Sequence, residues 1–398
     1  MALRNTTDRY GAVTKTFHWL TALLILTAIP LGWYATELPY GTSAELAKKA
    51  QFFSLHKTVG IAAFAVALLR ILWALSQPRP APLHPDRRVE TWLAETVHWS
   101  LYAAMVVVPA SGWITHAASE GFAPILWPLG QNLPLVPKSL MVEGIATAVH
   151  EVFTKVLILS ILLHVAGAMK HLVIDRDATL ARMLPGLPEV QISRPAPGHR
   201  PAVLAALAIY AAGFAGAYWL SLSHAAAPED GPQLAQAESQ WQVQEGRLGI
   251  TVQQLGSAVE GSFADWTAAI DFTEEADGGR HGSVTVQISI PSLRLGSVTT
   301  QAMGPDFFAA ETHPTAIFEA EIFAQGDGYV AEGVLDLKGT QVPVSLPFVL
   351  KIDGDTATMT GSTTLDRRDF GIGEAQTDPS QLGFEVAVAV KLTAIRGE

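Results

Sequence analysis

Four histidines of this chain lie inside long apolar stretches, and no cysteine accompanies them. They are His18, His56, His150 and His164, and the last two are 14 residues apart in one stretch. In an α-helix this separation is about 21 Å of rise with a net rotation of only about 40°. One helix would therefore present two imidazoles to its neighbours at two depths. Because imidazole is a common ligand of haem iron, the set predicts two stacked haem sites.

The composition limits how such a cofactor is held. Without cysteine the chain has no disulfides, no cysteine-ligated iron–sulfur clusters and no C-x-x-C-H attachment of c-type haem. Apolar residues make up 49% and charged residues 16%, which favours a membrane protein. Residues 1–228 carry 17 basic and 12 acidic side chains, whereas residues 229–398 carry 9 and 25. No basic patch for nucleic acid is evident, so we expect no nucleic-acid partner.

Five stretches are long enough to cross a membrane as helices. They cover residues 16–34, 52–75, 97–115, 146–169 and 203–222. The proline-rich segment 77–88 separates the second from the third and cannot continue a helix. We expect an all-α transmembrane four-helix bundle, an additional transmembrane helix at 203–222 and a flexible linker at 223–239. The N-terminus lacks the pattern of a removable signal peptide.

Lysine and arginine are unevenly distributed between the segments that join these spans. With the N-terminus inside, 11 basic residues lie on the inner side and 3 on the outer side, a bias typical of cytoplasmic loops. The inner residues are Arg4, Arg9, Lys15, Arg79, Arg87, Arg88, Lys170, Arg176, Arg182, Arg194 and Arg200, and the outer residues are Lys48, Lys49 and Lys138. The bias predicts a cytoplasmic N-terminus and an outer C-terminal part, which in a bacterial inner membrane is periplasmic.

This orientation sorts the histidines into pairs by depth. His18 begins the first span at the inner side and matches His164, while His56 and His150 begin their spans at the outer side. Intramembrane histidines also form hydrogen bonds between helices without any cofactor. Four histidines at two matched depths favour two haems, His18 with His164 and His56 with His150.

Arg70 lies 14 residues after His56, at the expected depth of the inner pair. A buried arginine usually has a partner, and a haem propionate is one candidate. The alternative is that its side chain reaches the inner lipid head groups. His171 and Lys170 follow the fourth span and either line a quinone head-group site or mark the membrane interface.

The remaining histidines give weaker signals. His98 and His116 flank the third span and have no partner at matching depth, so we expect them at the interface. His84 and His199 lie in loops, where a solvated or structural role is expected.

Residues 9–188 resemble the bacterial cytochrome b561 family of four-helix dihaem cytochromes. The matching segments are RYGAVTKTFHW, FFSLHKTVG, VALLRILW and VHEVFTKVLILSILLHVAGAMKHLVIDRDATLARMLP. The last contains two histidines at the family's 14-residue spacing. The resemblance implies that His18, His56, His150 and His164 are axial ligands of two non-covalent b-type haems, and that electrons are exchanged with a quinone such as ubiquinone.

Residues 240–398 have a different pattern, with short alternating or apolar runs between turn signals such as GDG at 326–328. Seven or eight antiparallel strands indicate an all-β closed barrel or sandwich. VEGSFADWTAAIDF, FFAAETHPTAIFEA, GVLDLKGTQVPVSLPF and LDRRDFGIG resemble the YceI-like family of lipocalin-like barrels. The resemblance implies a cavity for an isoprenoid chain, although a fully packed core is the alternative. Gln254 stands where many members have histidine, which leaves head-group selectivity open.

Together these features predict a membrane electron-transfer protein joined to an isoprenoid-binding barrel. An iron with two imidazole ligands has no open position, which favours outer-sphere electron transfer over oxygen binding. We expect a quinone-linked oxidoreductase, and the b561 resemblance implies superoxide oxidation coupled to ubiquinone reduction as one form of it. The alternative is an isoprenoid carrier whose cytochrome part senses or loads the lipid. Expected partners are the quinone pool, the bound isoprenoid, membrane lipids and a second copy of the chain.

Overall fold

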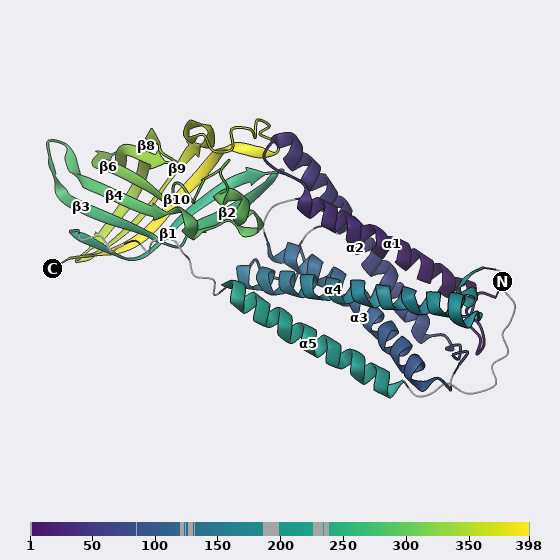
Figure 1. The fold of residues 1–398 in the computed structure, drawn as a ribbon. Helices are drawn as coiled ribbons and strands as arrows, with labels where there is room; N and C mark the ends of the chain where they lie inside the picture. The colour runs from purple at the N-terminus through teal and green to yellow at the C-terminus, as the bar shows by residue number, and fades with distance from the viewer. Residues whose placement is uncertain are drawn as a thin grey trace. The chain divides into compact units, whose positions relative to one another are not determined.

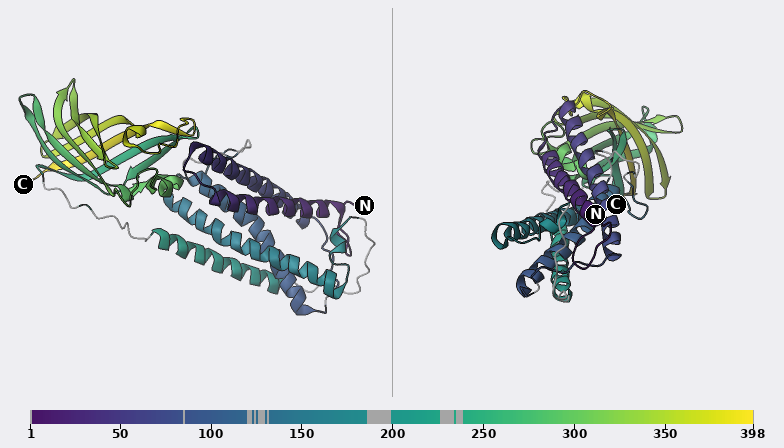
Figure 2. Two further views of the ribbon diagram at one scale, coloured as in Figure 1. Left: turned by 45° about the horizontal axis from the view of Figure 1, so that its top comes forward. Right: turned by 90° about the vertical axis from the view of Figure 1, so that its right-hand side faces the viewer.

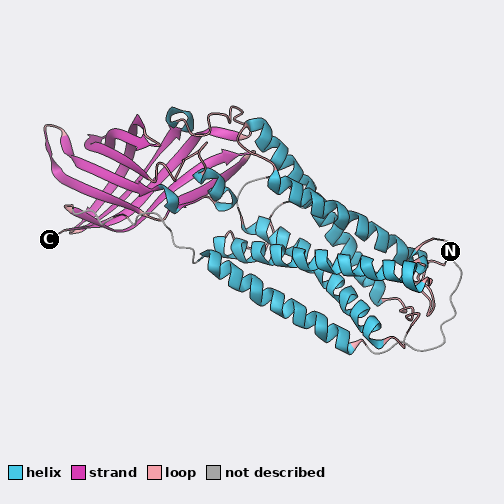
Figure 3. Cartoon of the chain, viewed as in Figure 1, coloured by secondary structure: helices cyan, strands magenta, loops and turns pink. Residues whose placement is uncertain are grey.

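The structure is a computed structural model, and it describes residues 2–84, 86–119, 123, 125, 130, 132–185, 199–225, 234 and 239–397. The chain separates into two compact units. The first comprises Met1–Glu37, Phe52–Ser119 and Pro124–Ala227, and the second comprises Leu38–Gln51, Glu120–Ala123 and Pro228–Glu398. Every described strand belongs to the second unit, as the colours of Figure 3 show. The expected division into a helical part and a β part is therefore confirmed.

Five long helices carry the apolar stretches. They are α1 (Ala12–Glu37), α2 (Ser43–Leu75), α3 (Arg88–Ala118), α4 (Leu140–Lys170) and α5 (Arg200–Ala225). All five are long and apolar enough to cross a membrane. Large apolar side chains such as Trp33, Leu72, Leu162 and Trp219 are more than half exposed on them. Apolar surface on this scale is what lipid-facing helices present, so the helical part is a membrane domain.

The predicted spans are shorter than the helices that contain them. α3 begins at Arg88, nine residues before the expected start of the span, and α4 begins at Leu140 with Ser139 as its N-cap. Hydrophobicity marks only the part of a helix that lies in hydrocarbon, whereas the helix continues into the head-group region. After α4 the chain makes a π-helical turn, His171–Asp175, which ends at Arg176 in the left-handed conformation.

The fifth helix packs against the bundle rather than standing apart as a simple anchor. Figures 1 and 2 show α5 lying along α3 and α4. Phe153 of α4 is completely buried, and its ring lies 4.7 Å from that of Tyr210 and 4.6 Å from that of Phe214. The Tyr210 hydroxyl donates a hydrogen bond to the Ser100 carbonyl of α3, at 2.8 Å. The sequence alone predicted the helix but not this aromatic contact.

The β part is a closed antiparallel barrel. Its strands are β1 (Trp241–Gln254), β2 (Ser257–Phe263), β3 (Trp266–Asp277), β4 (Arg280–Ser289), β5 (Leu293–Arg294), β6 (Thr315–Gln325), β7 (Gly328–Leu337), β8 (Thr340–Asp353), β9 (Thr356–Asp366) and β10 (Leu382–Arg396). Eight of them, all but β2 and β5, form the ring, and pairing of β1 with β10 closes it. The short helix α6 (Thr299–Met303) lies between β5 and β6. The sequence predicted either a closed barrel or a sandwich, and the structure is the closed barrel.

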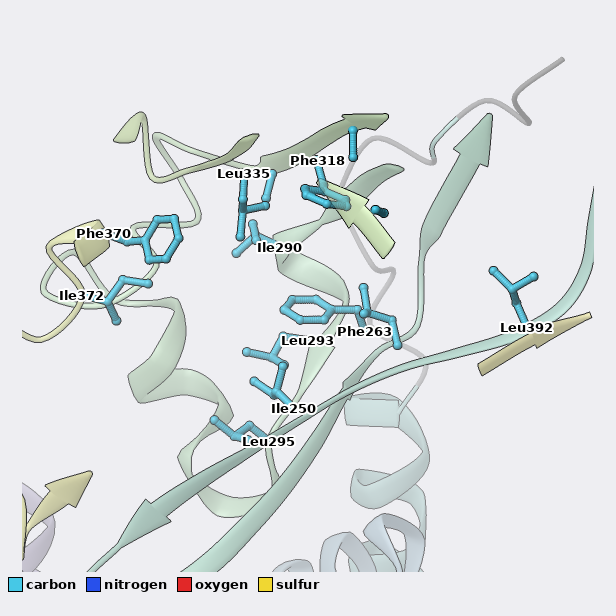
Figure 4. Close-up of a cluster of buried hydrophobic side chains, with 14 of the residues drawn as sticks. Ile250, Phe263, Ile290, Leu293, Leu295, Phe318, Leu335, Phe370, Ile372 and Leu392 are labelled. Carbon is cyan, nitrogen blue, oxygen red and sulfur yellow. The ribbon is translucent and has the colours of Figure 1, made fainter. Parts of the chain in front are cut away.

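The barrel interior is apolar at every level. Near α6, the side chains of Phe263, Ile290 and Leu293 gather into a packed cluster (Figure 4). Beside it lies a cavity of about 160 Å³, whose lining side chains are apolar or aromatic except for Thr363. The Trp241 indole N–H, which faces the same interior, is already bonded to the Phe272 carbonyl at 3.2 Å. An interior of this kind suits an apolar ligand.

We expect Gly213→Ala to destabilise the membrane domain. A Cβ atom at Gly213 would lie 2.8 Å from Cζ of Phe153, whose ring is held between two aromatic rings and cannot move aside. Overpacking of this kind costs about 1–3 kcal/mol, which exceeds the helix propensity gained from alanine, about 1 kcal/mol. Thermal unfolding in detergent, followed by helical circular dichroism, measures the effect. Gly216→Ala on the same helix is the control, because no atom lies within 4 Å of its Cβ position. Equal midpoints for the two variants would contradict the packing of α5.

Candidate cofactor site

Two pairs of histidines face one another inside the helical bundle. His18 of α1 and His164 of α4 have ring centroids 6.0 Å apart, with planes inclined at 58°. His56 of α2 and His150 of α4 have centroids 6.3 Å apart, with planes at 89°. α4 runs unbroken through both of its histidines, so the two pairs lie about 21 Å apart along that helix. The structure thus brings together the same pairs that the sequence predicts.

The distance within each pair indicates what fits between the rings. A direct N–H···N hydrogen bond would bring two imidazole centroids to about 5 Å. A metal ion with imidazole nitrogens on opposite sides, each about 2 Å away, separates the centroids by roughly 6 Å. The observed 6.0 and 6.3 Å match the second arrangement. The donor set and spacing therefore fit an iron held between two imidazoles at each depth.

We call His56 with His150 the outer pair and His18 with His164 the inner pair, after the depths expected from the sequence. The backbone of neighbouring helices orients the outer pair. Nδ1 of His56 lies 2.8 Å from the Ala28 carbonyl oxygen on α1, and Nδ1 of His150 lies 2.8 Å from that of Val108 on α3. A carbonyl oxygen only accepts, so Nδ1 carries the proton in both rings. Each Nε2 then keeps its lone pair for a metal. This is the usual arrangement around metal-binding histidines.

Glycines allow these rings to approach the helices so closely. A Cβ atom at Gly32 would lie 2.7 Å from Cε1 of His56, and one at Gly112 would lie 3.0 Å from Cε1 of His150. Each glycine comes four residues after the carbonyl that accepts the hydrogen bond, at Ala28 and Val108. A glycine therefore makes room for each of the two outer rings in the same way. The sequence alone does not reveal the role of these two glycines, because their partners lie on other helices.

The inner pair has different surroundings. Among the described residues, neither His18 nor His164 has a backbone carbonyl on Nδ1. Instead Nη2 of Arg70 lies 3.4 Å from Nδ1 of His18, and the guanidinium lies 5.3 Å from the ring centroid of Tyr102. A guanidinium cannot accept a proton or hydrogen bond, so Arg70 does not hold His18 as the carbonyls hold the outer rings. Arg70 is thus a cation next to the inner pair, available to a carboxylate ligand group.

One prediction about the third span was wrong. His98 has a partner at matching depth, since its ring centroid lies 5.1 Å from that of His164. The helix containing it begins nine residues earlier than the hydrophobic stretch, so His98 lies about three turns into α3 rather than at its end. His116 does lie near the end of α3, and its Nδ1 is buried without a hydrogen-bond partner in the described part of the chain.

The barrel holds a second candidate site, the apolar cavity. Gln254, at the position where sequence comparison leaves head-group selectivity open, is buried and does not line this cavity. Arg367 of the LDRRDFGIG motif is also buried, and it donates hydrogen bonds to backbone carbonyls, including those of Ile372 and Gly383. Arg367 therefore holds the turn after β9 together, while Leu365 at the start of the motif lines the cavity. The cavity offers shape and apolar surface, with one hydroxyl as its polar side-chain feature.

Comparison with known families agrees with this division of the chain. Residues 9–186 match the family described as prokaryotic cytochrome b561, and residues 237–394 match the family described as YceI-like domain. The chain joins a cytochrome b561 domain to a YceI-like domain. Both expected families are thereby confirmed. The cytochrome b561 family implies b-type haem, and the histidine pairs are where the bundle could hold it.

Individual relatives match one part or the other. Cytochrome b561 homolog 2 of Escherichia coli (strain K12) is 29% identical over 193 residues, which is 46% of this chain and 95% of the relative. The probable superoxide oxidase CybB of Yersinia pestis is 26% identical over 178 residues, 44% of this chain and 96% of the relative. The crystal structure of BcnA from Burkholderia cenocepacia is similar to 37% of this chain and spans 95% of its own, with 29% identity and a TM-score of 0.35.

We expect Gly32→Ala to lower the haem content of the purified protein. The added methyl group would meet the ring of His56 at 2.7 Å and push it away from the Ala28 carbonyl. Loss of an orienting contact behind a metal-binding histidine typically costs 10–100-fold in metal affinity. The pyridine haemochrome assay gives haem per chain. Gly60→Ala on α2 is the control, because its Cβ position is open and its haem content should stay at the wild-type value. Full haem content in Gly32→Ala would mean that the close approach is dispensable.

Proposed function

We propose that the membrane domain binds two b-type haems, one between His18 and His164 and one between His56 and His150. The observation that carries this proposal is the separation of the two ring pairs, 6.0 and 6.3 Å, which suits a metal between imidazoles. The hydrogen bonds of the outer rings to the Ala28 and Val108 carbonyls support it further. Bound haem supplies one-electron redox chemistry.

The protein's own contribution would be to hold, orient and enclose the two haems. Two imidazoles at each depth would hold one haem, and an iron bound by two imidazoles would have no open position for oxygen, which favours outer-sphere electron transfer. α4 fixes the distance between the two depths because both of its histidines lie on one continuous helix. Arg70 places a positive charge beside the inner pair, where we propose that it binds a haem propionate.

We propose that electrons pass between the quinone pool and a one-electron partner on the other face. The similarity to the probable superoxide oxidase of Yersinia pestis supports superoxide as that partner. We propose ubiquinone as the acceptor, as the resemblance to the cytochrome b561 family implies. The protein would then be a quinone-linked oxidoreductase. His171, which follows α4, is our candidate for the quinone head-group site, since it lies two helical turns beyond His164.

We further propose that the N-terminus is cytoplasmic and the barrel periplasmic, in a bacterial inner membrane. The excess of arginine and lysine in the inner loops and the odd number of spans support this orientation. We expect alkaline phosphatase fused after the C-terminus to be active, because that enzyme requires the oxidising periplasm. A fusion that is inactive while a cytoplasmic reporter at the same position is active would reverse the orientation.

For the barrel we propose an isoprenoid ligand such as a quinone. The supporting observation is the apolar and aromatic lining of the barrel cavity. We expect organic extraction of the purified full chain, followed by mass spectrometry, to release a polyprenyl lipid in about one copy per chain. A quinone would link the barrel to the membrane domain, whereas a redox-inactive polyprenoid would favour the alternative function, a lipid carrier. Absence of any lipid would indicate that the cavity does not serve as a binding site.

If the two haems are bound as proposed, each single variant should remove one haem and leave the other. His164→Ala should lose the inner haem and keep much of the outer one, and His150→Ala should do the reverse, because each haem would lose one of its two axial ligands. Wild-type protein should contain two haems per chain, extractable with acid acetone since no cysteine can hold them covalently. Haemochrome assays and redox-titrated visible spectra distinguish the two. One haem per chain in the wild type would contradict the pairing.

A further inference from the structure

Two imidazoles and a carboxylate meet outside the haem-type pairs, near the inner end of the bundle. Nε2 of His84 lies 3.0 Å from Oδ2 of Asp177, and Nδ1 of His171 lies 2.7 Å from the same oxygen. The two rings are parallel, with centroids 6.2 Å apart and planes inclined by only 2°. One donor atom from each residue lies within 4.8 Å of the other two. No other group of three such side chains comes together in the described part of the chain.

The three residues come from two connecting segments rather than from helix interiors. His84 lies in the segment between α2 and α3, while His171 and Asp177 follow α4. The side chains are partly shielded from solvent, since His84 is 35%, His171 23% and Asp177 13% exposed. A ligand there would link the two connections while staying reachable from the aqueous side.

The neighbouring charges compensate one another and leave the carboxylate of Asp177 unneutralised. Lys170 contacts Glu90 at 2.9 Å and Asp175 at 3.0 Å. Arg87 contacts the same two carboxylates, at 3.4 and 3.0 Å. These two cations and two anions form a network beside the cluster, and Oδ2 of Asp175 also lies 3.2 Å from Nδ1 of His171. One uncompensated negative charge next to two imidazoles favours a cation.

A neighbouring backbone group holds Asp177 in a fixed orientation. Its oxygen Oδ2 lies within hydrogen-bond distance of both imidazoles. Its other oxygen, Oδ1, accepts a hydrogen bond from the Thr179 backbone N–H at 2.8 Å. Such support behind a ligand carboxylate is typical of metal sites.

We propose that His84, His171 and Asp177 form a site for a divalent transition-metal ion of the zinc class, separate from the haem sites. Two imidazoles and one carboxylate are a common set of three protein ligands for zinc, with water in the fourth position. Tetrahedral bonds of about 2 Å put ligand atoms roughly 3.3–3.5 Å apart. The observed separations, up to 4.8 Å, therefore require side-chain adjustments of about an ångström. The site does not depend on a quinone at His171, although a bound ion would occupy the same imidazole.

The test is zinc binding by the intact, haem-containing chain, purified in detergent without a polyhistidine tag and freed of metal with a chelator. Isothermal titration with zinc chloride, with the metal counted by mass spectrometry after gel filtration, should give one zinc per chain. His84→Gln and Asp177→Asn should each weaken binding at least tenfold. Glutamine at 84 can still donate a hydrogen bond to Asp177, so a purely structural hydrogen-bonded cluster would tolerate this change. Visible spectra and thermal midpoints verify that both variants remain folded and loaded with haem.

His199→Gln is the matched control. Nδ1 of His199 lies 2.7 Å from Oε1 of Glu95, so it too forms a histidine–carboxylate pair, but the structure assigns it to no group of three. This variant should bind zinc with wild-type affinity. No saturable binding by wild-type protein would overturn the proposal, and so would equal affinity in the wild type, His84→Gln and Asp177→Asn.

Discussion

An imidazole can present a metal-binding nitrogen inside a membrane only if its other nitrogen is satisfied, because hydrocarbon offers no water to hydrogen-bond with it. In the outer pair, backbone carbonyls of neighbouring helices meet that condition. The fourth residue after each of these carbonyls is a glycine. The carbonyls of Ala28 and Val108 take the Nδ1 protons, and Gly32 and Gly112 leave room for the rings. The positions of α1 and α3 against their neighbours therefore follow from two hydrogen bonds of 2.8 Å. A larger side chain at either glycine would move a ring and a helix together.

The inner pair differs, because among the described residues neither His18 nor His164 has a backbone carbonyl oxygen on Nδ1, and the difference has electrostatic consequences. A cation, Arg70, lies beside His18, and another imidazole, His98, lies beside His164. Positive charge close to an iron site stabilises the reduced form of the iron relative to the oxidised form. A carbonyl that accepts the Nδ1–H of an imidazole ligand makes that imidazole more basic, which stabilises the oxidised form instead. If both sites carry haem, the inner one should therefore have the higher potential. Electrons would then move downhill from the outer to the inner face, the direction needed to oxidise a donor outside and reduce a quinone inside.

The sequence predicted the helices, the barrel and the histidine pairs because each leaves a periodic or positional signal. Apolar length marks the spans, and the 14-residue interval on α4 fixes two depths. Contacts between helices leave no such signal. His98 was misplaced because the hydrophobic stretch starts nine residues inside its helix, and the ring of Phe153 against α5 could not be foreseen from either segment. The cluster of His84, His171 and Asp177 was missed for the same reason, since its members are up to 93 residues apart.

The barrel differs from the bundle in what it can recognise. Its cavity is lined by apolar and aromatic side chains with Thr363 as the exception, so a polar head group moved inside would lose hydrogen bonds to water without replacing them. An isoprenoid tail gains about 25 cal/mol for each Å² of apolar surface that leaves water. On the proposed function, the cavity therefore selects the tail and leaves the head group at the opening. A quinone held in this way would keep its redox-active ring outside the barrel, so on the proposed function the barrel would store or deliver the molecule and the histidine-bearing bundle would carry the electron transfer.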